Sequence, residues 1–232
     1  MASSRPKVLF VFYTFTKQTG MVVDAMAEEL TERGCDVTKA ALEFPDTHYG
    51  GRFSKLPMPW PIWHIVTMLV PQRRRKTGEI GIPPEAQQGD YDLVVFGSPT
   101  WWLTTCMPVR SYLHSPAAKA VLDGKPFAAV SVSRRYYKGN LGDIEKLGEQ
   151  AGGTWVGGTR FVSDGNQVMS MASWLVFMRK NEPRRHYFGV PLPRPNLKED
   201  YAEQAKSYAR ELADKVFGSS AAVGADNSLP VA

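Results

Sequence analysis

The stretch KVLFVFYTFTKQTG, residues 7–20, decides the fold, because a buried strand, a hydroxyl-rich turn and a helix follow one another without a break. The apolar run from Val8 to Phe12 predicts a strand that is buried on both faces, as in a parallel sheet. From Met21 to Leu30, apolar residues recur at helical spacing and predict a helix. The turn between them therefore lies at the amino end of a helix.

Three threonines in this turn, Thr14, Thr16 and Thr19, offer hydroxyl groups close to the unpaired N–H groups and the positive dipole end of the helix. Lys17 adds a full positive charge. These groups suit a phosphate, although the glycine-rich fingerprints G-x-G-x-x-G and G-x-x-x-x-G-K-[ST] are absent. The alternative is a threonine-rich helix cap without a ligand, since turns and caps favour threonine in any case.

The rest of the chain continues the alternation of strands and helices. Further strands are predicted at residues 35–42, 91–97, 125–132 and 153–162, and helices at residues 107–113, 141–151 and 196–217. This pattern predicts an α/β fold, a doubly wound five-stranded parallel sheet in a single domain at residues 1–217, with a disordered tail at 218–232. Two irregular insertions, at about residues 43–88 and 163–195, interrupt the alternation.

The turn after the predicted third strand has the sequence GSPTWWL, residues 97–103. Pro99 stiffens the backbone, Thr100 offers a hydroxyl and an N–H group, and Trp101 and Trp102 offer planar faces on which a flat ring could stack. The alternative is that both tryptophans pack beneath the following helix.

Both turns resemble those of the flavodoxin-like family. Thr14, Thr16 and Thr19 fall on the T-x-T-x-x-T pattern that holds the phosphate of FMN in that family, and residues 97–103 resemble its second flavin loop. The resemblance covers residues 7–42 and 91–162 and the last helix, and it leaves both insertions outside. It implies the strand order 2-1-3-4-5, with the ligand beyond the carboxyl ends of the strands. Lys17 and Gln18 depart from the Gly-Asn usual in flavodoxins.

The turn after the predicted fourth strand is basic and aromatic, SRRYYKGN at residues 133–140, and departs from the Gly-x-Gly-Asp type of carrier flavodoxins. Its cations could stabilise an anionic reduced flavin or a nucleotide phosphate, and Arg135 and Tyr137 are candidates for orienting a substrate. The alternative is a solvated basic loop. The cofactor contacts implied by the resemblance are Thr14, Phe15, Thr16, Lys17, Gln18, Thr19, Pro99, Thr100, Trp101, Trp102, Leu103, Ser133, Arg134 and Tyr136.

The two insertions share a pattern, an apolar and aromatic segment followed by a basic cluster. One runs from Trp60 to Lys76 and the other from Met169 to Arg185, and both are too short to span a bilayer. A tryptophan-rich apolar face bordered by Lys and Arg is typical of elements that lie on anionic lipid. Alternatively, the insertions pack on each other, pack across a homodimer above the flavin, or simply enlarge the core.

The resemblance implies an FMN-dependent oxidoreductase that passes electrons from NAD(P)H or a protein donor to an apolar acceptor such as a quinone. The alternatives are a flavodoxin-type electron carrier and a flavin-free interaction module. The net charge of +5 and the insertions argue against the carrier, which is typically acidic and compact. No catalytic side chain is required, because the flavin performs the chemistry.

The composition and residue spacing argue against a metal site and against nucleic-acid binding. The four histidines, His48, His64, His114 and His186, form no close ligand pair, so a metal site is not expected. Nucleic-acid binding is disfavoured because the basic clusters adjoin apolar segments and no recognition motif is present. The two cysteines in 232 residues and the lack of a signal-like or membrane-spanning run predict a cytoplasmic protein, with peripheral membrane contact through the insertions.

Overall fold

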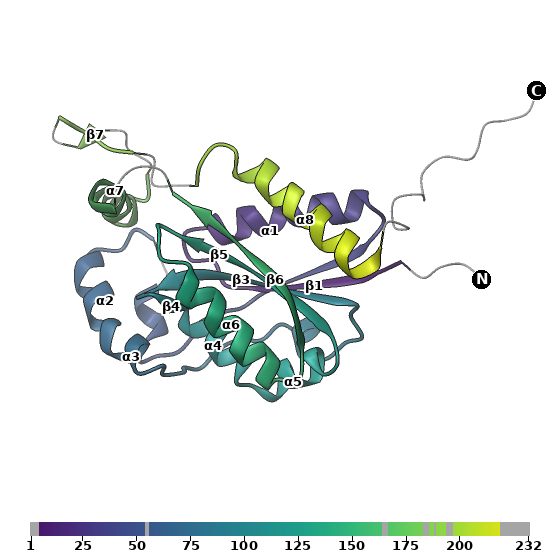
Figure 1. Cartoon of the computed structure of the whole chain (residues 1–232). Helices are drawn as coiled ribbons and strands as arrows, with labels where there is room; N and C mark the ends of the chain where they lie inside the picture. Colours follow the sequence, from purple (N-terminus) through teal and green to yellow (C-terminus); the bar gives the residue numbers. More distant parts are fainter. Residues whose placement is uncertain are drawn as a thin grey trace, which may run out of the picture.

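A computed structural model of the chain describes residues 5–53, 56–163, 167–182, 186–187, 189–193 and 197–218 (Figure 1). Its elements are β1 (Lys7–Phe12), α1 (Gln18–Glu32), β2 (Asp36–Ala41), η1 (Gly50–Phe53), α2 (Pro61–Thr67), α3 (Leu69–Arg73), η2 (Pro84–Ala86), β3 (Leu93–Trp101), β4 (Thr104–Thr105), α4 (Met107–Leu113), α5 (Pro116–Leu122), β5 (Pro126–Ser133), α6 (Lys138–Gln150), β6 (Thr154–Val162), α7 (Gln167–Lys180), β7 (His186–Tyr187), β8 (Val190–Pro191) and α8 (Tyr201–Phe217).

The main sheet has the strand order β2-β1-β3-β5-β6, and all four neighbouring pairs are parallel. Val8 of β1 lies between Val37 of β2 and Leu93 of β3. The short β4 pairs with β3 in the antiparallel direction. When only the parallel strands are counted, this is the predicted order 2-1-3-4-5, so the predicted fold class is confirmed.

Alternate residues of each central strand pack into two hydrophobic cores, one on each face of the sheet. Both faces are therefore buried, which explains why the sequences of these strands are continuous apolar runs. Val8, Phe10 and Phe12 of β1 pack with α1 and α8, whereas Leu9 and Val11 pack with α4, α5 and α6. Figure 1 shows α1 and α8 on one face of the sheet and α4, α5 and α6 on the other. The same view places α2, α3 and α7 near the end of the sheet where the parallel strands finish.

Strand β3 is longer than predicted, because residues 98–101, expected to be a turn, continue it to Trp101. Pro99 fits within this strand because β1 pairs with β3 only as far as Gly97, so no neighbouring strand on that side needs a proline N–H. Trp101 then pairs with Thr104 of β4. The expected loop is therefore the end of a hairpin.

The prediction that the last helix begins at residue 196 is wrong. α8 begins at Tyr201, and Leu197 instead forms an isolated bridge with Ser163 at the end of β6. Asn196 of the expected capping box lies outside the described residues, as do Arg184, Arg185 and residues 219–232 of the disordered tail expected at 218–232. The end of the helix at Phe217 agrees with the prediction.

The first insertion is organised by the buried carboxylate of Asp46. Its Oδ1 accepts hydrogen bonds from the N–H groups of His48 (2.8 Å) and Tyr49 (2.7 Å), and its Oδ2 accepts one from Glu79 (2.8 Å). The carboxylate therefore joins the two ends of the insertion. Burial alone would raise the pKa of Asp46, but the three N–H donors outweigh it and the pKa is lowered.

Replacing Asp46 with alanine is expected to lower the free energy of unfolding by about 2–4 kcal/mol, because hydrogen bonds to a charged acceptor are lost. The carboxylate stabilises the fold above its unfolded pKa, and this stabilisation is lost as the pH falls through the lowered folded value. Urea unfolding at neutral and acidic pH measures both effects. Asp24→Ala is the control, since Asp24 forms an exposed ion pair with Lys39, and equal effects of the two substitutions would contradict the prediction.

Candidate cofactor site at the carboxyl ends of the strands

The first loop forms a cradle of N–H groups at the start of α1. Lys17, the N-cap residue, has a left-handed backbone (φ 63°, ψ −9°) directly before the helical Gln18. When a residue with a left-handed backbone is followed by one with a right-handed helical backbone, their successive N–H groups point to the same side, as in anion-binding nests. A lysine in this conformation is uncommon, and it is tolerated where the surrounding structure fixes the loop.

Contacts at and beside Gly97 hold this loop against β3, where its pairing with β1 ends. The Tyr13 N–H group donates to the Gly97 carbonyl at 3.1 Å, and the Gly20 N–H group donates to Thr14 Oγ1 at 3.2 Å. A Cβ atom on Gly97 would lie 2.8 Å from Phe12 Cβ and 3.0 Å from the Thr19 methyl group. Only glycine therefore lets the first turn of α1 approach the sheet this closely.

The threonines of the loop differ in their positions. Thr19 is buried against Gly97, and the Thr14 hydroxyl accepts from within the loop. Thr16 is half-buried and makes one long contact, from Gln18 Nε2 at 3.4 Å, while Lys17 is exposed. Thr16 and Lys17 are therefore the groups best placed to meet a ligand from solvent.

The second loop is a two-residue turn in a strained conformation. Trp102 and Leu103, which join β3 to β4, both have positive φ values (48° and 70°). Two-residue hairpins with this backbone usually carry Asn-Gly. Contacts on both sides hold the turn in place. Trp102 Nε1 donates a hydrogen bond to the Ile65 carbonyl of α2 at 2.9 Å. On the other side, the Leu103 carbonyl oxygen lies against Gly139, so close that a Cβ atom on Gly139 would be 2.1 Å from that oxygen.

A buried polar cluster joins the second and third loops. Asn140, in the first turn of α6, donates through Nδ2 to the Ser98 carbonyl (3.0 Å), Thr100 Oγ1 (3.1 Å) and Ser131 Oγ (2.9 Å). Thr100 therefore directs its hydroxyl into the protein. Sequence reasoning missed Asn140, although a side-chain amide directly after a loop at this end of the sheet is a recognisable signal.

Trp101 belongs to an aromatic cluster that the first insertion completes. Its ring lies 5.6 Å from that of Tyr13, 4.8 Å from that of Phe53 and 6.3 Å from that of Phe44. Phe15 also reaches the insertion, with its ring 5.8 Å from that of Phe53. The cluster thus forms a wall beside the first two loops, and the insertion supplies two of its rings.

Some side chains of the third loop contact the second insertion, and others are exposed to solvent. Arg134 donates to Ser170 of α7 and lies over the Trp174 ring at 4.4 Å. Burial lowers the pKa of Arg134 to about 10, which leaves it protonated at neutral pH. Arg135 and Tyr136 are exposed.

The two candidate substrate-orienting residues lie in different surroundings. Arg135 is exposed, whereas the Tyr137 ring is covered by the Arg160 guanidinium at 4.4 Å. A covered ring has less freedom to turn toward a ligand, so Arg135 is the more accessible of the two.

Two buried polar atoms at this rim have no hydrogen-bond partner within the described part of the chain. They are Ser133 Oγ, at the end of β5, and Asn140 Oδ1, in the first turn of α6. Buried polar atoms are nearly always satisfied in folded proteins. Together with the N–H cradle of the first loop, these atoms fit a ligand that has a phosphate at one end and polar groups along a ring.

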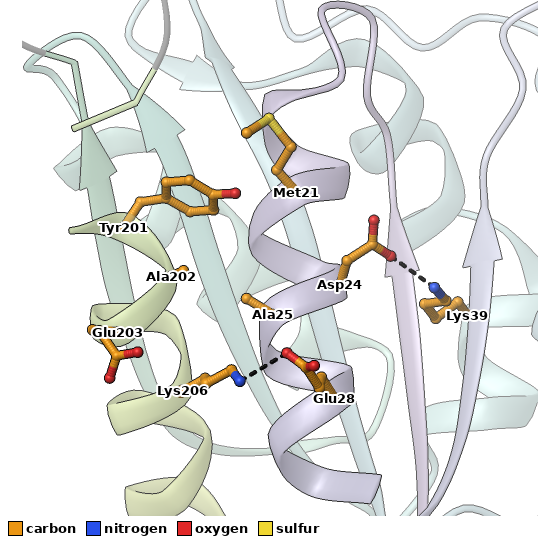
Figure 2. A pocket seen from close by; sticks show the side chains of 9 residues that line it. All are labelled: Met21, Asp24, Ala25, Glu28, Lys39, Tyr201, Ala202, Glu203 and Lys206. Atoms are coloured by element: carbon orange, nitrogen blue, oxygen red, sulfur yellow. Dashed lines mark hydrogen bonds and ion pairs between the residues drawn. The ribbon is translucent and has the colours of Figure 1, made fainter. Parts of the chain in front are cut away.

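A separate hollow of about 620 Å³ lies between α1 and α8 (Figure 2). Its two lysines are already paired, Lys39 with Asp24 at 2.7 Å and Lys206 with Glu28 at 2.8 Å. Because its three carboxylates outnumber its two lysines and it lies along the helices rather than among the three loops, we do not assign the cofactor to it. In the residues that the structure describes, no group of His, Cys, Asp and Glu is arranged to bind a metal ion.

No protein-family model and no curated protein sequence matches the chain. Solved structures do match it. A flavoprotein in complex with FMN from Lactobacillus acidophilus NCFM has a TM-score of 0.52 at 15% identity, covering 67% of this chain and 93% of its own. A flavodoxin from the domain Archaea has a TM-score of 0.50 at 11% identity, covering 91% of this chain and 99% of its own. At these identities the likeness shows the fold, which is flavodoxin-like.

Replacing Leu103 with glycine is expected to raise the free energy of unfolding by about 0.5–1 kcal/mol, because glycine adopts positive φ without a steric penalty. The Leu103 side chain is 55% exposed, so little packing is lost. Urea unfolding of the cofactor-free protein measures the change. Leu103→Ala is the matched control, because it shortens the side chain but keeps the Cβ atom, and equal stability of the two variants would count against backbone strain.

Proposed function

We propose that the protein binds FMN at the carboxyl ends of β1, β3 and β5 and acts as a flavin-dependent oxidoreductase. The observation that carries the proposal is the left-handed N–H cradle at the start of α1, which lies beside an aromatic hairpin at the point where the strand order reverses. This is where open α/β sheets bind their ligands. The flavoprotein from Lactobacillus acidophilus NCFM, which shares the fold, was solved in complex with FMN.

The first loop would hold the phosphate. The N–H groups at the start of α1 and the hydroxyl of Thr16 supply donors, and Lys17 supplies a positive charge. Thr14 and Thr19 keep the loop in shape through their contacts with Gly20 and Gly97. The division of roles follows from these contacts, since Thr19 is buried and the Thr14 hydroxyl is already engaged within the loop, whereas the Thr16 hydroxyl is held by one long contact.

The second and third loops would hold the ring. Trp102 and Leu103 present the strained end of the hairpin, and Ser133 Oγ and Asn140 Oδ1 offer hydrogen-bonding capacity to the polar edge of a flavin. When bound, FMN supplies the redox chemistry by accepting and passing on a hydride or single electrons. The protein would hold the cofactor beside the aromatic rings that the first insertion adds next to Trp101.

The acceptor that best suits this rim is an apolar molecule such as a quinone, with NAD(P)H or a protein as donor. The support is the aromatic and aliphatic surroundings of the loops, with the exposed Leu103 and Tyr136 at the surface and the cation Arg135 beside them. Arg135 could orient a substrate carbonyl or a donor phosphate. The second candidate function is electron carriage alone, which shares the same flavin site.

Thr16→Val is expected to weaken FMN binding about 10- to 100-fold, because a hydrogen bond to a charged phosphate contributes about 1.5–3 kcal/mol. Quenching of flavin fluorescence during titration measures the dissociation constant. Thr154→Val is the control, since Thr154 is exposed at the start of β6, at the opposite end of the sheet from the loops. Unchanged FMN affinity of the Thr16 variant would remove the first loop from the proposed site.

If the protein is an enzyme, the FMN-loaded form will oxidise NADH or NADPH in the presence of a short-chain quinone over many turnovers. The expectation follows from the apolar and aromatic side chains around the three loops, and the loss of nicotinamide absorbance measures it. A yellow protein that exchanges electrons with reduced protein donors but shows no sustained nicotinamide oxidation would instead favour the carrier.

A further inference from the structure

The outward face of α2 and α3 is apolar, which is the reverse of an ordinary surface helix. Five of its residues are exposed to solvent: Trp60 (74%), Ile62 (63%), Trp63 (66%), Val66 (51%) and Val70 (54%). They follow one another at helical spacing along residues 60–70 and form one stripe, which we call the outer stripe. Contiguous exposed apolar surface of this kind marks an interaction site, whereas single exposed residues do not.

The opposite face of the same segment is firmly anchored. Met68 and Gln72 are fully buried, and Gln72 Oε1 accepts a hydrogen bond from Arg110 Nη1 at 2.7 Å. Trp102 Nε1 donates to the Ile65 carbonyl, and the Met58 N–H group donates to the Met178 carbonyl of α7 at 2.7 Å. The outer stripe is therefore held in place by polar contacts on its inner side, and its exposure is not a result of loose packing.

Cations stand at both ends of the outer stripe. Arg73, Arg74 and Lys76 are exposed and begin three residues after Val70 in the sequence. At the other end, Arg179 and Lys180 are exposed and follow Met178, whose carbonyl meets Met58. The whole chain carries a net charge of +5, so the local and overall charges have the same sign. A partner for this surface must therefore combine an apolar layer with negative charge.

We propose that the outer stripe docks on the surface of an anionic phospholipid bilayer. Tryptophans are favoured at the depth of the headgroups, aliphatic side chains enter the acyl boundary, and flanking Lys and Arg pair with anionic headgroups. A second copy of the chain fits less well, because it would bring cations against cations at both ends of the stripe. In the part of the chain that the structure describes, no helix is long and apolar enough to cross a bilayer.

The two insertions contribute unequally to this surface. In α7, Trp174 lies beneath Arg134 and Met178 is fully buried, while Val168 is strongly exposed. The second insertion therefore supports the first and supplies cations, and the apolar contact comes from α2 and α3.

Membrane docking would also give the cofactor site its acceptor, a statement that rests on the proposed function. Ile65, whose neighbours form the outer stripe, accepts the hydrogen bond from Trp102 of the strained hairpin. An apolar acceptor dissolved in the bilayer would thus arrive next to the second loop. The docking itself does not require a flavin, so the two proposals can fail separately.

The test is sedimentation of the full chain with vesicles of phosphatidylcholine alone or with about 30% phosphatidylglycerol, at about 50 mM and about 500 mM salt. Binding is expected only with the anionic vesicles and is expected to weaken strongly at the higher salt. The emission of the exposed tryptophans should shift to shorter wavelength on binding. Binding to neutral vesicles as strong as to anionic ones, or no binding to either, would overturn the proposal.

Two pairs of variants separate the apolar and electrostatic contributions. Trp60→Gln with Trp63→Gln should lower the partition coefficient at least about 10-fold, whereas Val168→Gln with Val190→Gln, which alters exposed apolar residues of the second insertion, should change it little. Arg73→Glu with Arg74→Glu should lower it on the order of 25-fold or more, whereas Lys119→Glu with Lys198→Glu, which changes the net charge equally, should have a much smaller effect.

Two further measurements complete the test: the mass of the protein in solution and the vesicle binding of the Thr16→Val variant. A dimer that the Trp60 and Trp63 substitutions dissociate, together with no binding to anionic vesicles, would show that a second copy covers the stripe and would overturn the proposal. The Thr16→Val protein is expected to bind vesicles as the unaltered protein does. Normal vesicle binding by a protein that fails to bind FMN would support docking and contradict only the proposed function.

Discussion

The structure depends on the close approach of the first turn of α1 to β3 at Gly97, the residue where the pairing of β3 with β1 ends. Because Gly97 has no Cβ atom, Phe12 and the Thr19 methyl group can lie closer to its Cα atom than any side chain would allow. The first loop is then fixed between β1 and β3, where the strand order reverses. The N–H groups of the loop, the hairpin beyond Trp101 and the aromatic wall all take their places from this contact.

The core of the fold could be predicted from the sequence because it follows from local patterns. The apolar run at residues 8–12 indicates a doubly covered strand, and the order of strands and helices restricts the topology. The hairpin was not predicted, because Trp-Leu is an unusual sequence for a two-residue turn with positive φ values and carries no local signal. The start of α8 was also misplaced, since the bridge between Leu197 and Ser163 is a long-range contact that competes with helix formation.

The candidate site was predictable in its location but not in its details. The three loops come together as the strand order requires. However, the directions of individual side chains depend on partners far away in sequence, such as Asn140 for Thr100, Phe53 for Trp101 and Ser170 for Arg134. The insertions supply many of these partners, and their irregular sequences do not indicate which of their faces will be buried.

The burial of both sulfur atoms has a practical consequence. Cys35 and Cys106 are buried, and burial raises the pKa of both thiols, that of Cys106 to about 11. Neither thiolate is accessible near neutral pH, so both should react slowly with alkylating reagents. A maleimide dye or spin label attached to one engineered surface cysteine would then report on that position alone. Cys35 and Cys106 would not first have to be replaced.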